Sequence, residues 1–185
     1  MTVHGLLLAA GAGSRMGQPK ALVHDADGRS WLVRAIEVLR AGGCDQVDVV
    51  LGAAAEEALP LLEDTGATAV VAADWDAGMS ASLSAGLRAA AGSDADAVVV
   101  TLVDLPDVTA EVVQRLLLRG AHPGTLRRAT YDGRPGHPVV VGRAHWAGIV
   151  DQASGDEGAR AYLAAHHADA VECGDLATGA DVDHR

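Results

Sequence analysis

Residues 6–20 of the chain read LLLAAGAGSRMGQPK, an apolar run that passes directly into a glycine-rich loop. The apolar part predicts a buried strand over about residues 3–8. The glycines allow a sharp turn, so that several backbone amides can point at one anion. Arg15 and Lys20 add positive charge, and no acid lies between residues 5 and 24. We therefore expect a phosphate-binding loop directly after the first strand.

Lys20 is the only lysine in the chain, against thirteen arginines. A lysine carries a compact point charge, whereas an arginine presents a planar fork. A single lysine placed in this loop therefore indicates a site that needs a point charge. A plain tight turn between a strand and a helix would account for the glycines, but not for Arg15 and Lys20.

The rest of the chain alternates between strand and helix patterns, which favours an α/β fold in a single domain over residues 1–185. The run of apolar residues at 97–103 is typical of a central strand in a mostly parallel sheet. Further strands are predicted at 47–51, 68–72, 126–131, 138–141 and 168–173, and helices at 31–39, 54–62, 79–87, 108–118 and 157–165.

The composition excludes several classes of function. The net charge of −11 argues against a sequence-independent grip on nucleic acid or on an anionic membrane. No apolar run approaches the roughly 20 residues that cross a bilayer. Cys44 and Cys173 lack metal-ligand or redox spacing. We expect a cytoplasmic protein with reduced cysteines and with neither nucleic acid nor membrane as a partner.

Two familiar phosphate loops do not fit the spacing of residues 11–20. A Walker loop needs adjacent Gly-Lys-Ser/Thr, but Lys20 follows a proline. A dinucleotide fingerprint needs G-x-G-x-x-G and an acid closing the second strand. Here the three glycines leave one residue too many, and the second strand ends in Leu51-Gly52. A loop that surrounds a triphosphate with amides, Arg15 and Lys20 is the interpretation that remains.

Asp104 directly follows the predicted central strand. An acid in that position lies at the carboxyl edge of the sheet, where open α/β folds bind ligands. One or two carboxylates suit Mg²⁺, which fills its other positions with phosphate and water. The alternative is a turn-former or a cap for the helix at 108–118, a part that Asp107 or Thr109 can also take.

The stretch LAAGAGSRMGQPK at residues 8–20 resembles the signature of the nucleotidyltransferases that handle molybdenum cofactor, and most closely the MocA-like cytidylyltransferases. Ala-Ala-Gly, rather than Ala-Gly-Gly, is more similar to the cytidylyl branch than to the guanylyl branch. The resemblance implies a three-layer Rossmann-like nucleotidyltransferase fold and Mg²⁺ as cofactor. It implies a nucleotide site made of Leu8, Ala9, Ala10, Gly11, Gly13, Ser14, Arg15, Lys20, Gly78 and Ser80, although Ser80 can equally cap a helix.

Three residues are predicted to bind the acceptor. Between residues 115 and 143 there are six arginines and one acid, an excess that suits an anionic acceptor. Arg134 is the best candidate among them. His137 lies in a Gly-His-Pro element that resembles one lining the family's acceptor pocket. Asp156 lies in GDEGAR, which resembles another acceptor-side motif, although a helix N-terminus explains this acid as well.

Asp183 is predicted as a second metal ligand beside Asp104. The Asp-x-Asp at residues 181–183 resembles a second family acid, but the chain departs from the family pattern by ending two residues later.

The resemblance implies Mg-dependent transfer of CMP from CTP to the terminal phosphate of molybdopterin cofactor, with release of pyrophosphate. Arg15, Lys20 and Asp104 are the predicted catalytic residues, and a molybdoenzyme or its chaperone is a further partner. The alternatives are the use of GTP, transfer to a sugar, polyol or phospholactate phosphate, a non-catalytic cofactor carrier or chaperone, and an NAD-linked oxidoreductase, which the glycine spacing opposes.

Overall fold

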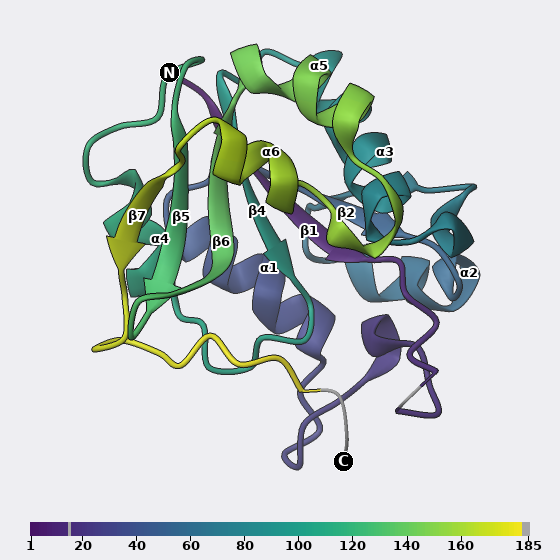
Figure 1. Cartoon of the computed structure of the whole chain (residues 1–185). Helices are drawn as coiled ribbons and strands as arrows, with labels where there is room; N and C mark the ends of the chain where they lie inside the picture. The colour runs from purple at the N-terminus through teal and green to yellow at the C-terminus, as the bar shows by residue number, and fades with distance from the viewer. Residues whose placement is uncertain (15, 183–185) are drawn as a thin grey trace.

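The structure, a computed structural model, describes residues 1–14 and 16–182. Seven strands form one sheet in the order β3-β2-β1-β4-β6-β5-β7. Helices cover both of its faces, so the molecule has three layers (Figure 1). The predicted α/β fold with a mostly parallel central sheet is confirmed.

The strands of the first half are parallel. They are β1 (Val3–Ala9), β2 (Gln46–Leu51), β3 (Thr68–Val71) and β4 (Ala97–Leu102). The second half adds β5 (Leu126–Tyr131), β6 (Arg134–Gly142) and β7 (Asp169–Glu172). Only β6 runs against its neighbours, because a short turn joins it to β5 as a hairpin, whereas β5 and β7 pair in parallel.

Each face of the sheet has its own set of helices. On one face lie α1 (Trp31–Ala41) and α4 (Ala110–Leu117). On the other lie α3 (Met79–Ala91), α5 (Arg143–Gln152) and α6 (Arg160–Ala165). Short segments complete the fold: α2 (Ala55–Ala58) and the 3₁₀ turns η1 (Lys20–Leu22), η2 (Leu59–Leu62), η3 (Trp75–Ala77) and η4 (Gly155–Glu157).

Alternation along β1 shows how the sequence fills both layers. Leu7 packs against the face of α1 and α4, whereas Leu6 and Leu8 pack against the face of α3 and α5. All three are buried. This two-sided burial explains why β1 has a continuous apolar sequence instead of a polar–apolar alternation.

The structure differs from the sequence-based expectation at three helices. The helix expected at 54–62 is the short α2 followed by the 3₁₀ turn η2. We did not predict α5, in which only Trp146 and Ile149 are buried, so that its apolar pattern is weak. The helix expected at 157–165 is two elements, η4 and α6, separated by Gly158 at φ +55°. No helix among the described residues is long and apolar enough to cross a membrane.

The sheet order places the two strongest motifs together. β1 lies between β2 and β4, so the chain leaves the carboxyl ends of β1 and β4 toward opposite halves of the sheet. Such a topological switch point opens a crevice at the edge of an open α/β sheet. The glycine-rich loop follows β1 and Asp104 follows β4, and both therefore border this crevice.

Candidate nucleotidyl-transfer site

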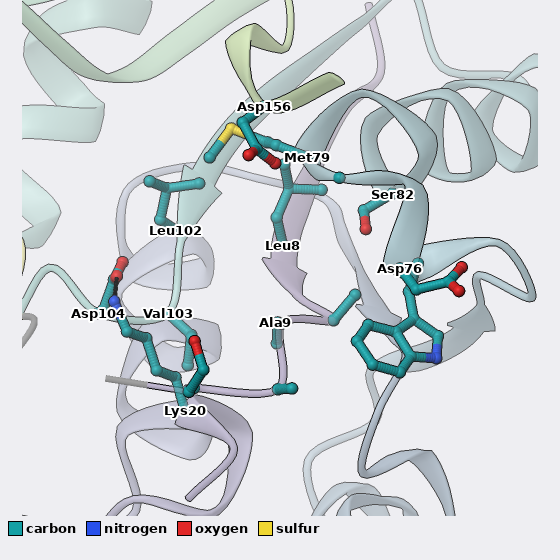
Figure 2. Close-up of a pocket in the computed structure, with 17 residues that line it drawn as sticks. Leu8, Ala9, Lys20, Asp76, Met79, Ser82, Leu102, Val103, Asp104 and Asp156 are labelled. Carbon is teal, nitrogen blue, oxygen red and sulfur yellow. Dashed lines mark hydrogen bonds and ion pairs between the residues drawn. The ribbon is translucent and has the colours of Figure 1, made fainter. Parts of the chain in front are cut away.

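A cavity of about 430 Å³ lies at this switch point. Figure 2 shows Lys20 and Asp104 at one side of it, Asp76 at the opposite side, and Asp156 with Met79 at a third. Eight of the ten predicted nucleotide-binding residues line it: Leu8, Ala9, Ala10, Gly11, Gly13, Ser14, Lys20 and Gly78. The loop after β1 therefore forms one wall of a real cavity.

Two glycines give the loop its course. Gly13 and Gly17 have φ values of +62° and +74°, in the left-handed region that other residues rarely adopt. A Cβ at Gly13 would lie 1.9 Å from the carbonyl oxygen of Gln18, so no side chain fits there. The amide of Met16 donates to the Gly13 carbonyl at 2.9 Å and closes the turn. This turn carries the chain back toward Lys20.

Lys20 and Asp104 are in direct contact. The Lys20 Nζ donates to Asp104 Oδ2 at 2.5 Å, and the exposed fractions of the two side chains are 19% and 10%. Asp104 does not cap α4, whose N-terminal cap position is Thr109. Asp107 accepts instead from the Thr178 amide and hydroxyl. The structure therefore excludes a capping role for Asp104 at α4, although residues 103–104 do form a turn.

The second oxygen of the same carboxylate is available for a ligand. Asp104 Oδ1 is buried and has no hydrogen-bond partner among residues 1–14 and 16–182. Leaving such an oxygen unpaired costs free energy, which a hard cation would recover. No three His, Cys, Asp or Glu side chains gather into a metal site within the described chain. The site thus fits a metal held by one described carboxylate and completed by phosphate and water.

The charge of the cavity lining also favours a bound divalent cation. Its described lining has one cation, Lys20, and three carboxylates, those of Asp76, Asp104 and Asp156. A triphosphate would meet repulsion from this lining unless a divalent cation came with it. Arg15 and Asp183 lie outside the described residues. Val182, the last described residue, donates its amide to the Asp104 carbonyl at 3.1 Å.

The N-terminus of α3 forms the wall opposite the loop and includes residues that the sequence analysis passed over. Ser82, which the sequence analysis did not name, lines the cavity, whereas Ser80 is buried outside it. Trp75 and Met79 line it as well. The signal that could have found Ser82 is the helical period, which places it about one turn after Gly78.

A second, smaller cavity of about 210 Å³ adjoins the first and shares Leu8 and Met79 with it. Its walls are mostly apolar, and its polar residues are Arg128, His137, Glu157 and Arg160. Burial, and then the charge of Arg128, lowers the pKa of His137 to about 4. His137 is therefore neutral near pH 7 and presents a neutral imidazole to the cavity.

The predicted acceptor residues fall in three different places. His137 lines the second cavity, and Asp156 lines the first, where its carboxylate lies over Gly78. Arg134 lines neither cavity, because it occupies the exposed start of β6. Arg128, six residues earlier, lines the second cavity in its place. Both arginines belong to the same arginine-rich stretch of sequence. Only the pairing of β5 with β6 in the structure reveals which of them faces a cavity.

Comparisons with known proteins agree with this geometry. Residues 5–171 match the family described as the MobA-like NTP transferase domain. The chain is 38% identical over 191 residues to the nicotine blue oxidoreductase of Paenarthrobacter nicotinovorans, with 98% of this chain and 92% of the relative covered.

Solved structures give the same result. A homologue of Mycobacterium tuberculosis Rv0371c from Mycobacterium sp. strain JC1 is 31% identical, with a TM-score of 0.82 and coverage of 98% of this chain and 90% of that one. A manganese complex of Rv0371c from M. tuberculosis is 26% identical, with a TM-score of 0.72 and coverage of 94% and 88%. The predicted nucleotidyltransferase fold is confirmed, and a related protein binds a divalent metal.

Proposed function

Since the chain belongs to the family of MobA-like NTP transferase domains, we propose that it transfers CMP from CTP to the terminal phosphate of molybdopterin cofactor. It is an enzyme of the nucleotidyltransferase type; the choice of CTP and of molybdopterin is our proposal. The observation that carries the reaction type is the shared cavity in which the loop after β1 meets Asp104 across the switch point.

The proposed reaction is a displacement at the α-phosphorus of CTP. An oxygen of the acceptor phosphate forms a new bond to that phosphorus while its bond to the α–β bridging oxygen breaks. Pyrophosphate leaves with the bonding electrons. The acceptor phosphate is already ionised, so no general base is needed, and catalysis consists of positioning and of charge neutralisation.

In this proposal the chain's own groups hold the triphosphate. Loop amides between Gly11 and Ser14, with Arg15 and Lys20, bind and neutralise the phosphates. Lys20 moves from the carboxylate to the phosphates when nucleotide enters. Ser82 and Gly78 line the part of the cavity that is proposed to hold the ribose and the base.

We propose Mg²⁺ as the metal, with Asp104 as its described ligand and Asp183 as a second, sequence-based candidate. Bound there, the ion would offset the charge of the triphosphate and of the leaving pyrophosphate. The unpaired Asp104 Oδ1 and the acidic lining support this assignment.

The acceptor would place its phosphate in the first cavity and its body in the second, past Leu8 and Met79. His137 and Asp156 are proposed to contact it, and a molybdoenzyme or its chaperone is the proposed recipient of the product. The adjoining apolar cavity, with its neutral imidazole, supports this arrangement.

The test is pyrophosphate release with each NTP and Mg²⁺ against a panel of acceptors: molybdopterin cofactor and a sugar, polyol or lactate phosphate. CTP with molybdopterin should give the highest kcat/KM. Greater turnover with GTP would exclude cytosine specificity, and turnover with a different phosphate would reassign the acceptor.

A second candidate is the NAD-linked oxidoreductase of the sequence analysis. It rests on the relative named nicotine blue oxidoreductase. The end of β2 opposes a standard dinucleotide mode, because Gly52 supplies no acid and packs directly against Trp75. Bleaching of nicotine blue by NADH or NADPH, without pyrophosphate release from any NTP, would favour this candidate over nucleotidyl transfer.

A further inference from the structure

Two adjacent arginines on β5 differ in how their charges are accommodated. Successive side chains on a strand point to opposite faces. Arg127 donates to the carbonyls of Leu116 at 3.0 Å and Gly120 at 2.6 Å, at the end of α4. Arg128 points to the opposite face and lines the second cavity. Arg127 therefore has a structural role that Arg128 does not share.

The Arg128 guanidinium is only partly satisfied. Its Nε is buried without a hydrogen-bond partner among residues 1–14 and 16–182. Burial, and then the charge of Arg160, lowers the pKa of Arg128. Arg160 lines the same cavity, and so does the exposed Glu157. An unpaired buried donor beside a second cation destabilises the folded protein, and a ligand that accepts hydrogen bonds would relieve this cost.

We infer that Arg128, supported by Arg160, is the residue that selects the acceptor substrate by binding a hydrogen-bond-accepting or anionic edge remote from its reacting phosphate. The inference rests on the proposed function in one respect, that the second cavity receives the acceptor.

The cavity also limits what that acceptor is. Aliphatic side chains such as Leu83, Val100, Val139 and Ile149 make most of its wall. The hydroxyl groups of a sugar phosphate would find no hydrogen-bond partners against these aliphatic side chains. The site instead fits a compact, largely apolar body whose far edge carries oxygen or nitrogen acceptors. A guanidinium binds such an edge through paired hydrogen bonds.

The test uses the full chain and molybdopterin as the probe. The equilibrium affinity for molybdopterin is measured without nucleotide. The KM for molybdopterin is measured in an assay of pyrophosphate release with CTP. Arg128→Gln should weaken molybdopterin binding about tenfold or more and raise its KM alike, with the KM for CTP unchanged. Arg128→Lys should restore only part of the affinity. Arg160→Gln should lower the affinity for molybdopterin less than Arg128→Gln does. Arg119 lies on the exposed surface beyond α4, so Arg119→Gln should leave this affinity unchanged.

Thermal unfolding separates a selecting role from a structural one. Arg128→Met should leave Tm unchanged or raise it, because it removes an unpaired buried donor, whereas Arg127→Met should lower Tm. If molybdopterin does not bind the wild-type protein, or if Arg128→Gln binds it unchanged, the inference is overturned. Pyrophosphate release from CTP could still occur in that case, so the proposed function is judged separately. Arg128-dependent binding without any such release would support the inference and contradict the proposed function.

Discussion

The ammonium of Lys20 lies 2.5 Å from the Asp104 carboxylate, although 84 positions separate them in sequence. The pair bridges the loop after β1 and the end of β4, and it lies in the cavity that the triphosphate is proposed to occupy (Figure 2). Lys20 would therefore hold one oxygen of Asp104 and repel a metal that binds the same carboxylate through the other. Nucleotide binding should release that oxygen, since the phosphates offer the ammonium an alternative partner.

Replacing Lys20 should move two affinities in opposite directions. Lys20→Met should bind Mn²⁺ without nucleotide about tenfold more tightly, because no ammonium occupies Asp104 Oδ2. The same variant should bind CTP more weakly. Electron paramagnetic resonance titration of Mn²⁺ and calorimetry with CTP measure the two effects. Lys20→Arg, which keeps the charge, is the control, and a parallel loss of both affinities would contradict the repulsion between Lys20 and the metal.

Asp104→Asn should lower kcat for pyrophosphate release by about 10²-fold or more, since it removes the charge that is proposed to hold the metal. Circular dichroism should show an unchanged fold, because Asp104 contacts no helix cap. A pure carrier of cofactor would keep delivering molybdopterin to a recipient enzyme when carrying this substitution. Delivery that survives the loss of Asp104 would therefore favour the carrier alternative.

Gly13→Ala should disrupt the loop, because the new Cβ would overlap the Gln18 carbonyl and φ of +62° is strained for alanine. We expect the KM for CTP to rise by at least tenfold. Gly11→Ala is the matched comparison: apart from its chain neighbours, no atom of residues 1–14 and 16–182 lies within 4 Å of its Cβ position, so its effect should be much smaller. A KM for CTP that Gly13→Ala leaves at the wild-type value would show that the loop does not contact nucleotide as proposed.

His137 should make stability depend on pH. Its pKa is about 4 in the fold and 6.5 in a model peptide, so between these values the unfolded chain binds a proton that the folded chain excludes. The free energy of unfolding should therefore fall as pH drops from about 6.5 to 4, by up to about 3 kcal/mol.

Urea unfolding at several pH values measures this dependence, and His137→Gln should flatten it. Glu172 is the internal reference. Its carboxylate accepts from the Thr130 hydroxyl and from three backbone amides, which lowers its pKa from 4.5 to about 2. Its contribution to stability should be present above pH 4.5 and lost as pH falls toward 2. A profile that His137→Gln leaves unchanged between pH 4 and 6.5 would contradict a neutral His137.

Local patterns allowed the layers and the sheet to be predicted. The apolar run before residue 9 and the run at 97–103 are long enough to indicate buried strands, and the family resemblance that their flanking motifs carried is confirmed. The weakly patterned α5 could not be found in this way. The roles of Arg15, Asp183 and the other site residues stay predictions.

What the sequence determined by itself is therefore the chemistry of two strand ends: a glycine loop with Lys20 after one strand, and Asp104 after another. Only the tertiary structure decided that Lys20 and Asp104 touch, and that Arg128 rather than Arg134 faces a cavity. The reason is physical. Residue type and spacing fix hydrogen-bonding capacity and local conformation, whereas strand order and hairpin register determine which distant side chains meet.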